Sequence, residues 1–208
     1  MDRGRLEAFS DGVFAVAITL LVFNLAAPQP GHGLMGHQLA SHWPSFLAYG
    51  VSFLTIGIIW VNHHALLRNF AAVDRTMLFL NLLMLFFVVT IPFATATVAA
   101  YLREGGADAS LAAAIYQGVF LGMSLAFGTL LAWSIRRRHL AVPLTGTAAR
   151  TALVRFTSGI LAYAAAIGIA YLSAPASLVI SILIAVYYVF EHTPGAPPAP
   201  GGAEPGEG

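Results

Sequence analysis

The sequence contains no cysteine, all ten of its basic residues are arginine, and charged residues of any kind are scarce. Without cysteine, disulfides and thiolate metal sites are excluded. Charged residues make up 9% of the 208 residues, against about a quarter in soluble domains, while hydrophobic residues make up 58%. A formal net charge of +1 gives no reason to expect a nucleic-acid or acidic partner. The composition therefore predicts a protein embedded in the lipid bilayer.

Several functional motifs are also absent. There is no TVGYG-type loop, whose carbonyl groups would form a potassium filter, and no helix punctuated by arginine, as a voltage sensor requires. There is no phosphate-binding loop and no His-Glu-x-x-His zinc motif, and the apolar segments hold few ionisable side chains. These absences argue against an enzyme, a cofactor and a resident metal ion.

Six apolar segments are long enough to be membrane-spanning helices, since about 20 residues cross the hydrocarbon core. They lie near Ala8–Ala27, Pro44–Leu67, Thr76–Tyr101, Leu111–Ile135, Ala152–Leu172 and Ala176–Phe190, the last being the shortest. No internal repeat divides them, so we predict an all-α fold, a transmembrane bundle of six helices, as one domain over residues 1–192. The Pro/Gly-rich tail, residues 193–208, cannot build a core and is predicted to be disordered.

The arginines fall mostly on one side of the predicted membrane. The ends and loops of that side carry Arg3, Arg5, Arg68, Arg75, Arg136–Arg138, Arg150 and Arg155. The other side carries only Arg103, and its first loop, residues 28–42, has three histidines but no Asp, Glu, Arg or Lys. Because cytoplasmic loops are rich in basic residues, this asymmetry predicts a multi-pass protein of the cell membrane with both termini in the cytoplasm.

The first apolar segment has two different sides. Ser10 and Asp11 lie at the edge of the apolar run, where a carboxylate needs protein, water or a cation as its partner. At 100° per residue they point away from a nearly apolar stripe, which consists of Gly12, Val16, Thr19, Leu20, Phe23 and Ala27. The pattern alone favours a stripe that packs against another helix or lipid.

A second polar group lies near the end of the second segment, in the run Trp60-Val61-Asn62-His63-His64. Adjacent histidines point in different directions on a helix, so this pair alone is a poor metal site. Polar groups inside a bilayer need partners, and we expect hydrogen bonds to Asn81 or to the polar residues of the first segment. We call this predicted set of contacts the polar latch. A proton relay through His63 or His64 is the alternative interpretation.

Several of these residues recur in the pattern of a known family. The pattern comprises Arg5-x-x-x-Phe9-Ser10-Asp11, Ala15 with the run 17–21, Trp60-x-x-His63-His64, Asn81 and Pro92-Phe93. It resembles the signature of the transmembrane protein 175 family of potassium channels. The resemblance covers the first three predicted helices, and the last three only by length and topology. Prokaryotic members have six helices and assemble as tetramers, and animal members carry two such units in one chain.

The resemblance implies a homotetramer in which four copies of the first helix line a pore for potassium ions. Apolar side chains of this helix form the constriction in the family, and their counterparts here are Val16, Leu20 and Phe23, where other members usually have Ile or Leu. Thr19 matches the pore threonine of the family. The stripe is then pore lining instead of a packing surface. The signature residues assigned to hold this helix in place are Arg5, Phe9, Ser10, Asp11, Trp60, His63, His64 and Asn81.

We therefore expect a cation channel with weak to moderate potassium selectivity and a hydrophobic constriction in place of a carbonyl filter. An apolar ring gates by size and dewetting, and potassium holds its water less tightly than sodium. Its partners would be potassium ions, the bilayer and its own copies. The alternative is a small cation carrier or exporter that uses Asp11 and His63/His64. A membrane scaffold without transport is a third possibility.

Overall fold

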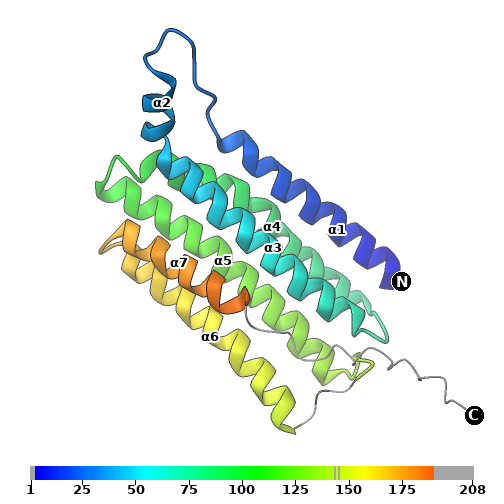
Figure 1. The fold of residues 1–208 in the computed structure, drawn as a ribbon. Helices are drawn as coiled ribbons and strands as arrows, with labels where there is room; N and C mark the ends of the chain where they lie inside the picture. Colours follow the sequence, from blue (N-terminus) through cyan, green and yellow to red (C-terminus); the bar gives the residue numbers. More distant parts are fainter. Residues whose placement is uncertain (1–2, 143, 145, 190–208) are drawn as a thin grey trace, which may run out of the picture.

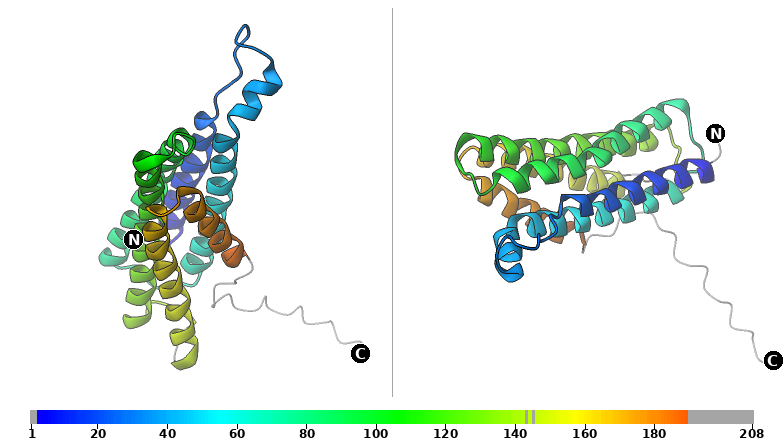
Figure 2. Two further views of the ribbon diagram at one scale, coloured as in Figure 1. Left: turned by 90° about the vertical axis from the view of Figure 1, so that its left-hand side faces the viewer. Right: turned by 90° about the horizontal axis from the view of Figure 1, so that it is seen from above.

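The computed structural model describes residues 3–142, 144 and 146–189, which form seven α-helices, one 3₁₀ helix and their connecting loops (Figure 1). The helices are α1 (Arg3–Leu20), η1 (Leu21–Asn24), α2 (Met35–Ser41), α3 (Trp43–Arg68), α4 (Arg75–Tyr101), α5 (Gly106–Arg136), α6 (Gly146–Ala170) and α7 (Ala174–Val189). The long helices form one bundle, and the short α2 stands off one end of it (Figure 2). The tail predicted to be disordered, residues 193–208, lies outside the described residues.

Five helices, namely α1 continued by η1, α3, α4, α5 and α6, are long and apolar enough to cross a membrane. The sixth predicted segment forms α7, which is apolar but has 16 residues. At 1.5 Å per residue this length is about 24 Å, against a hydrocarbon core of about 30 Å. The predicted all-helical membrane fold is confirmed, and a sixth complete span stays a prediction.

Several helix boundaries differ from those predicted. α1 begins at Arg3 instead of Ala8, because helix propensity does not depend on hydrophobicity and a helix can extend beyond its apolar run. The first segment was predicted to stay helical to Ala27, but α1 gives way to the 3₁₀ turn that ends at Asn24, ahead of two prolines that cannot continue a helix. Helix α2, within the loop 28–42, was not predicted.

The position of α1 at an edge of the bundle matters most for function (Figures 1 and 2). It packs on α3 and α4, and the bundle continues from α4 to α5, from α5 to α6 and from α6 to α7, which in turn contacts α3 and α5. The helices α4 and α5 approach closely at Gly122, where the ring of Phe87 occupies the space that a Cβ would take. One face of α1 is thus packed against its own subunit, and the other is left uncovered.

The arginines gather at one end of the bundle, as predicted. There α1 begins and α3 ends, and Arg3 Nη1 donates to the main-chain oxygens of Arg68 (3.0 Å) and Phe70 (3.3 Å). Arg103 lies at the opposite end, where its guanidinium donates to the main-chain oxygen of Ser41. The orientation of these two ends across the membrane stays a prediction.

Helix α5 ends at the arginine-rich end in a Schellman turn. Arg138 N donates to Ile135 O (3.2 Å), and His139 N donates to Ser134 O (3.0 Å). This turn needs a left-handed residue, a place that glycine usually takes, and here Arg138 adopts a φ of 55°. The chain then reverses, and the main-chain oxygen of His139 accepts a hydrogen bond from Ala71 N (2.8 Å). The turn thereby joins the end of α5 to the loop between α3 and α4.

Candidate functional site

Three helices meet at a buried hydrogen-bond network made of Ser10 (α1), His63 (α3) and Asn81 (α4), none of which has exposed surface. Asn81 Nδ2 donates to Ser10 Oγ (3.0 Å), and Ser10 Oγ donates to Leu6 O (2.8 Å). His63 Nε2 lies 2.7 Å from Asn81 Oδ1, and it carries the proton because an amide oxygen only accepts. Since polar groups inside a bilayer need partners, this network fixes which side of α1 faces the bundle.

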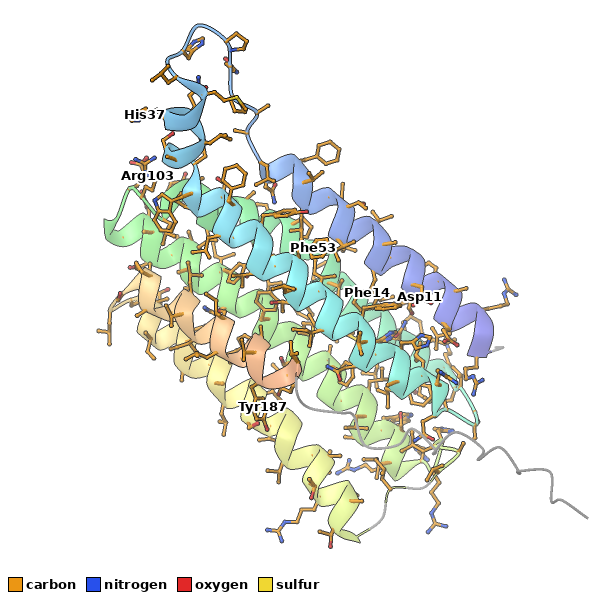
Figure 3. All side chains as sticks on the ribbon, viewed as in Figure 1. Asp11, Phe14, His37, Phe53, Arg103 and Tyr187 are labelled. Carbon is orange, nitrogen blue, oxygen red and sulfur yellow. The ribbon has the colours of Figure 1, made fainter. Side chains whose placement is uncertain are left out.

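Two further side-chain pairs join α1 to α3. Trp60 Nε1 donates to Asp11 Oδ1 (2.8 Å). One turn further along α3, His64 Nδ1 lies 3.1 Å from Glu7 Oε1. Figure 3 shows Asp11 and Phe14 turned from α1 toward the bundle, and the ring of Phe14 lies 5.4 Å from that of His63. The structure thus brings the predicted polar residues together, and it adds Glu7 as the partner of His64.

Two signature residues lie apart from these contacts. Arg5 is exposed at the start of α1, and Phe9 is 52% exposed on its outer side. Neither side chain holds α1 against α3 or α4. Both are therefore available to groups outside this subunit, and their assigned part in holding α1 stays a prediction.

The uncovered face of α1 coincides with the predicted stripe. The buried residues of α1 and η1 recur every three or four positions and are Leu6, Ser10, Phe14, Ala17 and Leu21. On the other side, Val16 is 55% exposed, Leu20 41% and Phe23 81%, and Gly12 and Thr19 are exposed as well. Ala27 was assigned to the stripe but lies beyond the helix, in the loop that follows η1.

The hydroxyl group of Thr19 is satisfied by its own helix. Its Oγ1 lies 2.9 Å from Val16 O and 3.0 Å from Ala15 O, and it donates to these carbonyl groups. Because the proton is used in this way, the lone pairs of the Thr19 oxygen remain available to accept from water or to face a cation. Thr19 is therefore the one oxygen-bearing side chain within an otherwise apolar stretch of the stripe, between Val16 and Phe23.

The 3₁₀ turn η1 changes the geometry of the stripe at its far end. Side chains three positions apart eclipse one another in a 3₁₀ helix, so the turn brings Phe23 nearer to the line of Leu20, the last residue of α1, than a continued α-helix would. Asn24 Nδ2 donates to Pro92 O of α4 (3.0 Å), and this contact ties the end of η1 to the bundle. The sequence reasoning did not single out Asn24, although a lone amide at the end of an apolar run is a signal for such a tether.

A further cluster of hydrogen bonds lies at the arginine-rich end and is centred on Asp74, the residue before α4. Asp74 Oδ1 accepts from Met77 N (2.7 Å), and Oδ2 accepts from Trp133 Nε1 (2.9 Å) and lies 3.0 Å from His139 Nε2. Burial raises the pKa of Asp74, but these hydrogen bonds outweigh it and hold the pKa below its ordinary value. The cluster joins α4 to the end of α5.

Apolar helices of membrane-spanning length, polar side chains paired between them and an edge helix with an uncovered face define a multi-pass membrane protein. Within the described part of the chain, no group of three or more His, Cys, Asp or Glu side chains could hold a metal ion. The family model described as "Endosomal/lysosomal potassium channel TMEM175" matches residues 5–92, the stretch that contains the signature from Arg5 to Pro92. A potassium channel of Streptomyces collinus is 47% identical over 195 residues, which cover 93% of this chain and 94% of that protein. The chain belongs to the TMEM175 family of ion channels and is not an enzyme.

A relative of known structure and an animal relative agree with this family assignment. The crystal structure of a lysosomal potassium-selective channel TMEM175 homologue from Chamaesiphon minutus superposes with a TM-score of 0.79. It is 34% identical, and the match covers 90% of this chain and 96% of that one. The human endosomal/lysosomal proton channel TMEM175 is 36% identical over 113 residues, which are 50% of this chain and 22% of that protein.

Proposed function

We propose that four copies of this chain form a potassium-conducting pore across the cell membrane, with α1 of each copy lining the axis. The potassium channels among its relatives and the fold shared with the homologue from Chamaesiphon minutus support this function. The observation that carries the proposal is the uncovered face of α1, which its own subunit leaves bare while burying the opposite face. Four such faces turned toward one axis would enclose a pore without any carbonyl filter.

The narrowest part of this pore is built from Val16, Leu20 and Phe23. The 3₁₀ turn brings Leu20 and Phe23 near one line, so they form successive rings about 6 Å apart, from three residues at about 2.0 Å rise each. Such rings exclude water when narrow, and an ion must shed part of its hydration shell to pass. The oxygen of Thr19 lies between the rings of Val16 and Phe23 and partly replaces the lost water. This arrangement gives weak to moderate preference for potassium, which holds water less tightly than sodium.

A groove beside the stripe fits the tetrameric assembly. It has a volume of about 320 Å³, lies between α1 and α3, and is lined mainly by apolar groups, among them Phe14, Ile18 and Ile56. Side chains of a neighbouring copy would fill it once the stripes meet at the axis. The arginine-rich end, with the N-terminus of α1, then faces the cytoplasm. The carrier alternative loses support because Asp11, His63 and His64 each face another side chain of their own subunit.

Single-channel recording of the purified protein in planar bilayers tests the proposed function. We expect unitary current steps whose reversal potential under potassium/sodium gradients shifts toward potassium, and a tetramer by native mass measurement. A carrier would give flux without unitary steps, and either that result or a stable functional monomer would overturn the proposal.

A further inference from the structure

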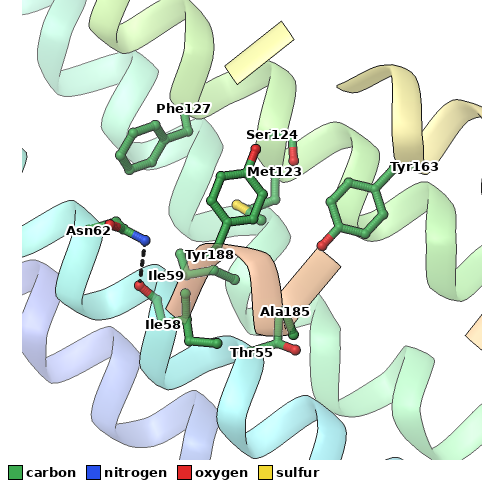
Figure 4. Close-up of a pocket in the computed structure, with 10 residues that line it drawn as sticks. All are labelled: Thr55, Ile58, Ile59, Asn62, Met123, Ser124, Phe127, Tyr163, Ala185 and Tyr188. Atoms are coloured by element: carbon green, nitrogen blue, oxygen red, sulfur yellow. Dashed lines mark hydrogen bonds between the residues drawn. The ribbon is translucent and has the colours of Figure 1, made fainter. Parts of the chain in front are cut away.

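A cavity of about 60 Å³ lies on the side of α3 that faces away from α1 (Figure 4). It forms where α3, α5, α6 and α7 come together, near the last two turns of α7, which contribute Ala185 and Tyr188. The pore stripe and the polar latch contribute none of its walls. The cavity is therefore separate from the site proposed for conduction.

Two hydroxyl groups in this cavity lack partners. Tyr163 enters from α6 and is 4% exposed, and its ring is held by stacking on Phe120, with 5.5 Å between the ring centroids. Its hydroxyl makes no hydrogen bond to any residue in the described part of the chain, and the same holds for Ser124 of α5. Figure 4 shows the Tyr163 hydroxyl directed toward Ala185. Buried polar groups in native proteins are nearly always paired, so the unpaired hydroxyl of buried Tyr163, with that of half-buried Ser124 in the same cavity, points to a missing hydrogen-bonding ligand.

Neighbouring polar groups show that the two unpaired hydroxyls differ from the rest of the cavity wall. Thr55 Oγ1 donates to Val51 O (2.7 Å), and Asn62 Nδ2 donates to Ile58 O (3.0 Å), as drawn in Figure 4. Each of these side chains thus donates a hydrogen bond to the main chain of its own helix. The remaining hydrogen-bonding capacity is thus concentrated on the α5 and α6 side of the cavity.

The other residues that line the cavity indicate the chemistry of the rest of the ligand. Ile59, Met123 and Phe127 supply an apolar surface, and none of the described residues that line the cavity is charged. A volume of this size has room for roughly four to six atoms of water size. The two hydroxyls can partner one water, but the cavity has room for several more atoms, whose neighbours are mainly apolar and would leave further waters without the two to four polar partners that each needs. The shape and chemistry match a short hydrocarbon chain that ends in a hydroxyl group.

We propose that this cavity binds the hydroxyl end of an uncharged amphiphile about the size of butanol. Its hydroxyl group pairs with those of Tyr163 and Ser124, and its carbons lie against Ile59, Met123 and Phe127. Butanol is the natural probe, because it matches the cavity in length and carries no charge.

We expect a ligand in the cavity to change conduction through the proposed pore. This expectation rests on the proposed function. The cavity is lined by Ile58, Ile59 and Asn62, and the same two turns of α3 carry Trp60 and His63 on another side. A ligand that fills the cavity pushes on α3, whose opposite side holds α1. Butanol is therefore expected to change the potassium current.

Photolabelling of the full-length purified protein with a diazirine derivative of butanol tests the binding site. We expect labelled peptides to map to α5, α6 and α7 around Met123, Tyr163 and Tyr188, and excess butanol to compete. Ser124→Ala and Tyr163→Phe should each reduce labelling several-fold, and Ala185→Leu, which fills the cavity, should abolish it. Tyr49→Phe, which alters a half-buried tyrosine of α3 away from the cavity, is the matched control and should label as the wild type does.

The outcomes separate the parts of the proposal. Labelling that does not saturate, or that persists in Ala185→Leu, overturns the binding site and indicates water or general lipid-like partitioning. If Ala185→Leu does not fold, unchanged labelling of Ser124→Ala and Tyr163→Phe overturns it equally. If labelling saturates but butanol leaves the potassium current unchanged, only the coupling of the cavity to α1 is overturned. A protein that shows no current before butanol is added overturns the proposed function and leaves the binding site intact.

Discussion

The three tryptophans provide a matched series for measuring how firmly Asp11 holds the edge helix α1. Replacing tryptophan by phenylalanine keeps an aromatic ring and removes the indole N–H. Trp60 Nε1 donates to Asp11 at 2.8 Å, and among the described residues it is the only hydrogen-bond donor to that carboxylate. A hydrogen bond to a charged group contributes about 1.5–3 kcal/mol. Because Trp60 is 40% exposed, we expect Trp60→Phe to lower the free energy of unfolding by the smaller value, about 1.5 kcal/mol.

The other two tryptophans calibrate this value. Trp133→Phe also removes a bond to a carboxylate, but Asp74 keeps its contacts with Met77 N and His139, so we expect a smaller loss of about 0.5–1 kcal/mol. Trp43 at the start of α3 is 53% exposed and makes no hydrogen bond through its indole to the described residues. Trp43→Phe is therefore expected to change the free energy by less than about 0.5 kcal/mol.

Circular dichroism during titration of the detergent-solubilised protein with sodium dodecyl sulfate measures all three variants on the same scale. The expected order of destabilisation is Trp60→Phe first, Trp133→Phe second and Trp43→Phe last. If Trp60→Phe were as stable as Trp43→Phe, the bond to Asp11 would contribute nothing to holding α1. A larger loss for Trp133→Phe than for Trp60→Phe would show that the redundancy of partners at Asp74 has been misjudged.

Four other predictions concern the pore and the arginine-rich end. Leu20→Asn should hydrate the constriction and give larger basal current with poorer discrimination among potassium, sodium and caesium, and loss of assembly without leak would instead indicate packing. Thr19→Val should reduce potassium preference in bi-ionic reversal potentials while conduction survives. Arg138→Gly should raise the free energy of unfolding by roughly 0.5–1 kcal/mol, since glycine adopts a positive φ without steric cost. The contribution of Asp74, whose folded pKa is depressed, is present above its unfolded pKa of about 3.9 and is lost as the pH falls through the folded pKa. The protection of amides at the ends of α4 and α5 from hydrogen exchange, relative to the intrinsic exchange rate at each pH, should therefore fall below about pH 4, and Asp74→Asn should remove that acid dependence.

The features that were predictable from sequence depend on length and on helical periodicity. Runs of apolar residues identified the helices, because the thickness of the bilayer sets their minimum length. The spacing of three and four separated the two sides of α1, and the need to pair polar groups linked Trp60 and Asn81 to its polar side. These inferences need only the local geometry of a helix.

The features that were missed depend on contacts between distant segments. Asn24 and Pro92 are 68 residues apart, and the hydrogen bond between them ties the end of η1 to α4. Glu7 precedes the first segment as predicted, and it comes beside His64 because α1 extends back to Arg3. The side chains that contact the Asp74 carboxylate lie 59 and 65 positions further along the chain, and no local sequence pattern predicts such contacts. The short helix α2 has no hydropathy signal of its own.

The tethers of α1 allow its two faces to change independently over evolution. Arg3, Asp11 and Asn24 fasten the helix at its start, near its middle and at its end, and all three contacts belong to the bundle side. Substitutions at Val16 or Phe23 leave every one of these contacts intact. Single mutations can therefore change the outward face without removing any of the contacts that hold α1 to the bundle.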